Sequence, residues 1–170
     1  MSEQFDDWQR RIDAVWADAD LDDQARIEAI DALADELGAE HPVALFERAG
    51  ARDSAGHEVD AEPLYRAALA AGLDPRRRVR ATIQLASTIR NLGKTEEALA
   101  LLRDAYAAGA DAELHDEASA FYALALASAG DPTRGLSIAL QALAPHLTLY
   151  TRSVGAYARE LVAPDEGSMP

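Results

Sequence analysis

The chain has 170 residues, with 16 basic and 30 acidic residues, a formal net charge of −14 and no cysteine. The lack of cysteine excludes disulfides and thiolate metal sites within this sequence, and the negative charge argues against nucleic acid as a partner. The sequence contains no apolar run of 18 residues and no signal-like N-terminus, so we expect a soluble, cytoplasmic protein without a membrane partner.

The charge is concentrated in the first part of the chain. Residues 1–62 hold 5 basic and 18 acidic residues, a net charge of −13, whereas residues 63–170 have a net charge of −1. The acidic part is either a solvated face or a docking surface for a basic partner, and the sequence leaves both interpretations open.

Residues 1–38 contain two predicted amphipathic helices. The first covers residues 3–17, and its apolar stripe consists of Phe5, Trp8, Ile12 and Val15. Asp20 is expected to cap the second helix, which should end before Gly38. We interpret residues 1–38 as an N-terminal capping pair, because a terminal repeat otherwise exposes its apolar side.

A repeat of 37 residues organises the middle of the chain. Glycine recurs at one turn, and small residues recur where two helices should cross. These positions are Gly56, Gly93 and Gly130 in the turns, Ala49, Ala86 and Ala123 in first helices, and Ala61, Ala98 and Gly135 in second helices. The spacing predicts three helix pairs, over residues 42–55 with 58–71, 76–92 with 95–108, and 112–129 with 132–144. Ala86 is expected to be buried, and Thr95 to cap its helix.

Pro145 ends the repeats, and a last helix is predicted over residues 146–162. Its expected inner face consists of Leu147, Tyr150, Val154, Tyr157 and Leu161. We interpret this helix as a C-terminal cap, and residues 163–170 as a disordered tail.

The repeat resembles the tetratricopeptide repeat family. Ala61-x-x-x-Tyr65 and Ala98-x-x-x-Leu102 follow the family pattern, and Leu85-Ala86 stands where the family has Leu-Gly. Arg48 replaces an expected leucine, and the period of 37 residues is longer than the usual period of about 34. In this spacing the chain is similar to a small bacterial subgroup of the family that has no assigned biochemical role. The resemblance implies an all-α, right-handed superhelical solenoid of about nine helices in one domain over residues 1–162.

The resemblance also implies a concave groove lined by the first helix of each pair. Helix 76–92 carries a polar stripe opposite its apolar stripe, with acidic positions one repeat earlier and apolar positions one repeat later. The predicted groove residues are Glu47, Asp53, Ser54, Arg80, Gln84, Ser87, Arg90, Asn91, Phe121 and Leu124. We expect Arg90 to anchor a ligand while held between Asp53 and Glu47. An ordinary solvated helix face stays the alternative interpretation.

No residue pattern indicates catalysis. The four histidines lack ligand spacing, the turn glycines form no phosphate loop, and the carboxylates lack an apolar setting suited to acid–base chemistry. We therefore expect no metal, no cofactor and no enzymatic activity.

The favoured hypothesis is a module that binds a protein or peptide segment in the groove. Two alternatives stay open: a sensor that holds a small anionic ligand in the same groove, and a structural protein that forms a homodimer. The sequence does not identify the partner.

Overall fold

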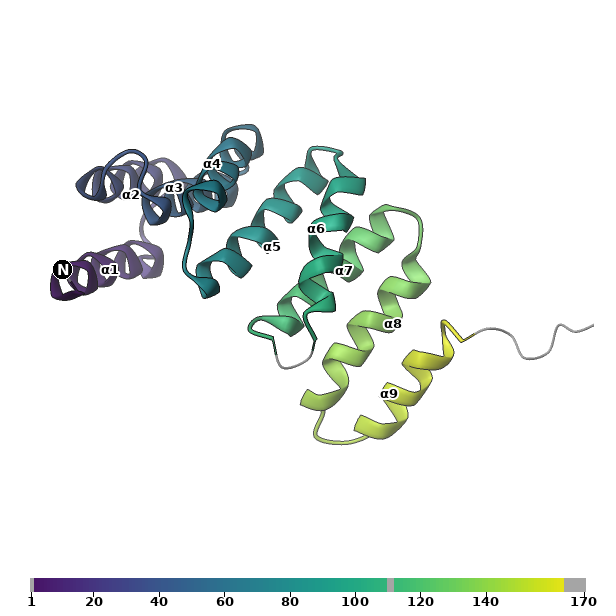
Figure 1. The fold of residues 1–170 in the computed structure, drawn as a ribbon. Helices are drawn as coiled ribbons and strands as arrows, with labels where there is room; N and C mark the ends of the chain where they lie inside the picture. The colour runs from purple at the N-terminus through teal and green to yellow at the C-terminus, as the bar shows by residue number, and fades with distance from the viewer. Residues whose placement is uncertain (1, 110–111, 164–170) are drawn as a thin grey trace, which may run out of the picture. The chain divides into compact units, whose positions relative to one another are not determined.

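The computed structural model describes residues 2–109 and 112–163, so the predicted tail lies outside the described residues except for Ala163. Within these residues the chain forms nine α-helices, one 3-10 turn and no strand (Figure 1). The predicted all-α class is therefore confirmed.

The helices follow one another through short connections. Their bounds are α1 Ser2–Ala17, α2 Asp23–Leu37, α3 Pro42–Ser54, α4 Glu58–Ala71, α5 Pro75–Asn91, α6 Thr95–Ala107, α7 His115–Ser128, α8 Pro132–Leu143 and α9 Thr151–Glu160, with the 3-10 turn at Ala144–His146. Within the described ranges, none of these helices combines the length and apolarity that crossing a bilayer requires.

Two helices begin later than predicted, α7 at His115 and α9 at Thr151. Leu114 and Tyr150, directly before them, adopt left-handed backbone conformations with φ of 59° and 68°. A residue in this region cannot continue a right-handed helix, so it separates the new helix from the preceding turn.

Aspartates cap three helices by accepting backbone hydrogen bonds. Asp22 caps α2, Asp74 caps α5 and Asp131 caps α8. The predicted cap Asp20 is therefore wrong for α2. Thr95 is also not a cap, because it is the first residue of α6 itself.

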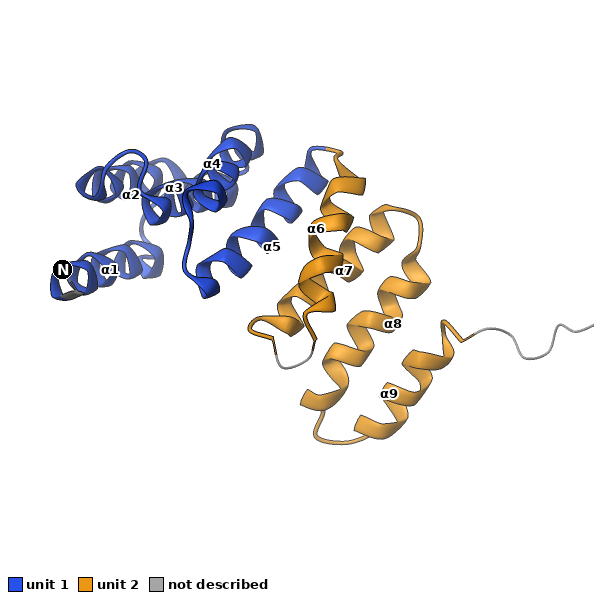
Figure 2. Ribbon diagram, viewed as in Figure 1, with its two compact units in different colours: residues 1–92 blue, residues 93–170 orange. Residues whose placement is uncertain are grey.

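The helices form two compact units, which Figure 2 colours separately. Unit 1 is residues 1–92 with α1–α5, and unit 2 is residues 93–170 with α6–α9. The sequence predicted one domain over residues 1–162. The boundary falls in the turn of the second predicted pair, so the pairing of α5 with α6 stays a prediction, as do the capping roles of the terminal helices.

In unit 1, α3 packs against α2, α4 and α5. The core of unit 1 contains side chains that are each at most 2% exposed: Trp8, Ile12, Ile30, Phe46, Ala49, Tyr65, Ala86 and Ile89. Ala86 is fully buried, as predicted from its recurrence. Small residues at these positions allow the helix backbones to approach closely.

A buried hydrogen-bond cluster joins α3, α4 and α5. The Tyr65 hydroxyl donates to Asp53 Oδ2 at 3.2 Å, and Thr88 Oγ1 donates to Asp53 Oδ1 at 2.9 Å. Tyr65 and Thr88 are both 0% exposed. Because one carboxylate binds a donor from each neighbouring helix, the cluster fixes how the three helices are placed along one another.

In unit 2, α7 and α8 cross most closely at Gly135. A methyl group at this position would lie 2.6 Å from the backbone oxygen of Ala123 on α7. Real Cβ atoms essentially never approach so closely, so the crossing requires glycine. Both residues are buried, as the repeat predicted.

The predicted inner face of the last helix is wrong at three of its five residues, whereas Leu147 and Val154 are half-buried. Tyr150, Tyr157 and Leu161 are 75%, 65% and 42% exposed, whereas the small residues Gly155 and Ala158 are buried. Close packing explains the difference, because Ser137 Oγ on α8 donates to the Ala158 carbonyl oxygen at 2.6 Å, an approach that large side chains would prevent.

We expect Thr88→Val to lower the free energy of unfolding by about 1–3 kcal/mol, because it removes a buried donor from Asp53. Thr82→Val is the matched control, since each hydroxyl oxygen lies 2.9 Å from the carbonyl oxygen four residues earlier in α5, whereas only Thr88 also reaches Asp53. Chemical denaturation measures both variants. Equal stabilities would contradict a structural role for the Asp53 cluster.

Gly135→Ala should destabilise the chain by about 1–3 kcal/mol, because the added methyl overpacks the α7–α8 crossing. Gly155→Ala in α9 is the control, since its Cβ would meet only ordinary contacts at 3.5 Å or more. That variant should be neutral or gain about 0.5–1 kcal/mol from the better helix former. Thermal melts that rank the two variants in the opposite order would contradict the close crossing.

Candidate functional site

Side chains from α1, α3 and α5 line a half-open cavity of about 510 Å³ in unit 1. We call it the α1–α3–α5 cavity. Its lining residues are Gln9, Asp13, Trp16 and Ala17 of α1, Glu47 of α3, and Arg80 and Gln84 of α5. Three of them, Glu47, Arg80 and Gln84, are predicted groove residues.

Glu47 is the buried charge of the cavity, with 5% of the residue exposed. Its Oε2 accepts a hydrogen bond from Trp16 Nε1 at 2.8 Å. Burial raises the pKa of the Glu47 carboxyl, although the Trp16 hydrogen bond and the positive charges of Arg80 and Arg77 oppose this shift. Keeping this carboxylate charged therefore costs the folded chain stability.

Two arginines of α5 stand near Glu47 in different settings. The Arg77 guanidinium donates to Gln9 Oε1 at 2.6 Å and to Asp74 Oδ2 at 2.7 Å, which links α5 to α1. The Arg80 guanidinium lies 5.2 Å from the centre of the Phe46 ring, a cation–π contact that orients it. Within the described residues, no carboxylate forms an ion pair with Arg80.

Gln84 gives the cavity wall an unused acceptor. Its Oε1 is buried and has no hydrogen-bond partner among the described residues. A buried polar group left in this state costs about 1–3 kcal/mol. If the Gln84 amide rotated toward the cavity, its oxygen could accept a hydrogen bond from a ligand N–H, which would remove that cost.

Asp53 belongs to the structure of unit 1 rather than to a ligand site. Burial raises the pKa of its carboxyl, and the hydrogen bonds from Thr88 and Tyr65 oppose the shift. Each oxygen of the Asp53 carboxylate accepts one of these two hydrogen bonds. The expected ion pair of Arg90 with Asp53 does not form within the described residues, since the Arg90 guanidinium donates to Asn91 Oδ1 at 3.2 Å.

Three other predicted residues of unit 1, Ser54, Arg90 and Asn91, lie at the C-terminal ends of α3 and α5. Asn91 Nδ2 donates to Glu58 Oε1 of α4 at 3.5 Å, and Ser54 Oγ donates to the Ala51 carbonyl of its own helix. Ser87 is half-buried between the two ends of α5. The structure therefore brings together Glu47, Arg80 and Gln84, whereas Ser54, Arg90 and Asn91 contact their own helices or α4.

Phe121 and Leu124 belong to unit 2. Phe121 is half-buried, and Leu124 is 51% exposed beside Leu136 in an apolar hollow of about 390 Å³ at the α7–α8 crossing. Their combination with the groove residues of unit 1 stays a prediction.

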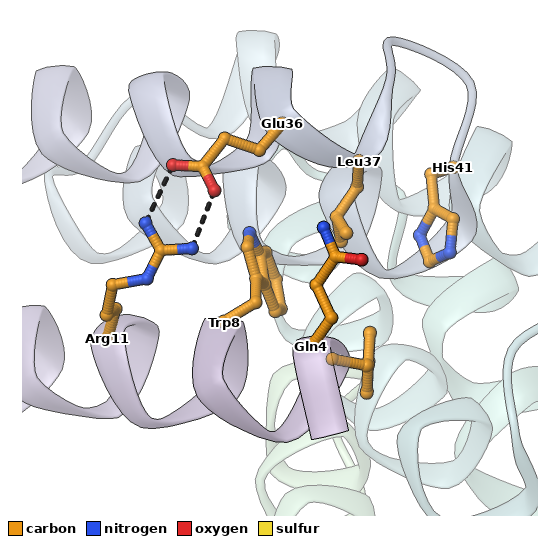
Figure 3. A pocket seen from close by; sticks show the side chains of 7 residues that line it. Gln4, Trp8, Arg11, Glu36, Leu37 and His41 are labelled. Atoms are coloured by element: carbon orange, nitrogen blue, oxygen red, sulfur yellow. Dashed lines mark hydrogen bonds and ion pairs between the residues drawn. The ribbon is translucent and has the colours of Figure 1, made fainter. Parts of the chain in front are cut away.

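A second cavity of unit 1, of about 560 Å³, lies between α1 and the C-terminal end of α2 with the connection that follows it (Figure 3). It is lined by Gln4, Phe5, Trp8, Arg11, Glu36, Leu37 and His41. Arg11 binds Glu36 through two hydrogen bonds of 2.8 and 2.6 Å, and Trp8 Nε1 donates to the Leu33 carbonyl at 2.7 Å. Because its charged groups are paired with each other, this cavity is the weaker candidate.

Sequence reasoning missed the α1 side of the site because α1 falls outside the 37-residue register. The signal was nevertheless present: Gln9, Asp13 and Trp16 stand at i, i+4 and i+7, the spacing of one helix face. Within residues 2–109 and 112–163, no cluster of three or more histidines and carboxylates could hold a metal ion.

A family model described as tetratrico peptide repeat matches residues 42–161, which is more than half of the chain. No curated protein and no solved structure matches the chain.

We expect Glu47→Gln to raise the melting temperature near pH 7. Because folding raises the pKa of Glu47, stability is lost as the pH rises from the unfolded pKa through the folded one. The variant lacks this loss and keeps an acceptor for Trp16. Its advantage should therefore shrink as the pH falls to about 4, which thermal melts across this range measure.

Glu36→Gln is the control of opposite sign. The hydrogen bond from Arg11 lowers the pKa of Glu36, so its stabilisation is present above the unfolded pKa and is lost as the pH falls. This variant should melt below wild type near pH 7, again with a difference that shrinks in acid. Identical melts of wild type and Glu47→Gln at every pH would contradict the buried charge.

Proposed function

Because the chain belongs to the tetratricopeptide repeat family, we propose that it is a non-enzymatic module that binds a partner protein segment in the α1–α3–α5 cavity. Repeats of this family generally mediate protein–protein interactions and are typically scaffolds rather than enzymes. The family supports the general proposal of protein binding, and we propose the cavity as the place where the partner binds.

One observation carries the proposal: the cavity has polar side chains that the fold leaves incompletely used. Among the described residues, Gln84 Oε1 has no partner, and the buried Glu47 accepts an indole N–H but forms no ion pair. Buried polar groups in proteins are nearly always satisfied, so exceptions are expected at functional sites.

The size of the cavity suits a peptide side chain with its flanking backbone. Pockets that bind small molecules or side chains range from about 300 to about 1,000 Å³, and the cavity falls within this range. Its walls come from three different helices, so the packing of unit 1 prepares the site before a partner arrives.

A sensor for a small anionic ligand is the second candidate, and Arg80 is the observation in its favour. Arg80 has no carboxylate partner among the described residues and is oriented by Phe46. An anion bound there would, however, lie near the carboxylates of Glu47 and Asp13, which line the same cavity. This repulsion favours a protein segment.

The test is a selection of random peptides of about 12 residues on the immobilised full chain, followed by affinity measurements in solution. Ala17→Phe places a large side chain at the cavity wall from an exposed position. It should weaken the selected peptides by at least about tenfold, or ~1.4 kcal/mol, without lowering the melting temperature.

Ala14→Phe is the matched control, since Ala14 is also exposed on α1 but does not line the cavity. It should leave the affinity unchanged. Peptides that bind both variants like wild type would place the site elsewhere, and a selection that enriches no peptide would contradict peptide binding.

A further inference from the structure

The α1–α3–α5 cavity presents hydrogen-bond acceptors to a ligand. Trp16 occupies Glu47 Oε2, and Gln9 Nε2 donates to Asp13 Oδ1 at 2.8 Å. Each carboxylate thus receives a hydrogen bond from a neutral donor, and no described lysine, arginine or histidine lies within ion-pair distance of either. Gln84 also lines the cavity, and its buried Oε1, which has no partner among the described residues, becomes available to a ligand when the amide turns.

The balance of charge in the cavity is negative. Arg77 is already paired with Asp74, which leaves Arg80 as the positive charge that faces the carboxylates of Glu47 and Asp13. Unit 1 as a whole has 11 basic and 19 acidic residues, a net charge of −8. Its field therefore attracts basic segments and repels acidic ones.

Other ligand groups fit these acceptors poorly. A carboxylate or phosphate would face Glu47 and Asp13 and would bring no donor for Gln84. An apolar side chain would cover Glu47 and Gln84 without satisfying them, which is unfavourable for buried polar groups.

We infer that the partner segment inserts a basic side chain, lysine or arginine, into the α1–α3–α5 cavity, where its N–H groups bind Glu47 and Gln84. The inference rests on the proposed function and adds the chemistry of the partner. It also chooses between the two interpretations of the acidic N-terminal part of the chain, in favour of docking.

Trp16 completes the arrangement. A lysine or arginine has an aliphatic stem and a charged head, and the stem packs well on an aromatic surface while the head reaches a carboxylate. Trp16 lines the cavity and holds Glu47 through its indole N–H, so one residue serves both purposes.

The test uses the selected peptides with their basic residues replaced, lysine by norleucine and arginine by citrulline. Fluorescence anisotropy of labelled peptides on the full chain should show affinity falling by at least about tenfold for one such replacement. Trp8→Phe leaves Trp16 as the single tryptophan, and its emission should shift when the original peptide binds.

Glu47→Gln should weaken the original peptide to a similar degree, because it removes the charge that receives the basic group. Glu28→Gln is the control, since it makes the same charge change at an exposed position of α2 outside the cavity. It should leave the affinity unchanged.

Two results separate the inference from the proposed function. Selected peptides without a basic residue, or norleucine and citrulline peptides that bind as well as the originals, would overturn the inference. If Ala17→Phe still abolished their binding, the proposed function would stand. A selection without any enriched peptide would reject both.

Discussion

The carboxylate of Asp53 is the interaction on which the arrangement of unit 1 depends. It accepts a buried hydrogen bond from α4, through Tyr65, and another from α5, through Thr88. A shift of α4 along α3 would separate the Tyr65 hydroxyl from Asp53, and a shift of α5 would separate Thr88 from it. The same helix carries Glu47 nearly two turns earlier, so the cluster that fixes α3 against α5 also keeps Glu47 and Gln84 in the lining of one cavity.

The two carboxylates of α3 show how one helix can serve both structure and binding. Burial raises the pKa of both, which makes each of them costly to keep charged. The Asp53 carboxylate accepts hydrogen bonds from two core side chains, and these offset the free-energy cost of burying its charge. Glu47 receives only the Trp16 indole from α1, and its remaining capacity faces a cavity. Only the second arrangement leaves room for a partner.

Periodicity predicted the helices, the buried Ala86 and the helix faces that carry Glu47, Arg80 and Gln84. It could not predict contacts across helices: a polar stripe shows which way Asp53 points but not that Thr88 reaches it before Arg90. Two other features were not predicted, because they also depend on contacts between helices. Arg48, where the family has leucine, forms ion pairs with Asp31 and Asp35 of α2. Helix α9 buries its small residues rather than its large ones, because small residues let its backbone pack closely against α8.

The close approach at Gly135 limits how far the repeats are interchangeable. Ala61 in α4 and Ala98 in α6 take the position that Gly135 takes in α8, and both are fully buried. Putting α8 in the place of α4 would leave a methyl-sized gap against α3, which a helix pair tolerates at a modest cost. Moving α4 or α6 into the last repeat would force a methyl group against the Ala123 carbonyl. Recombination between repeats is therefore tolerated in one direction and opposed in the other.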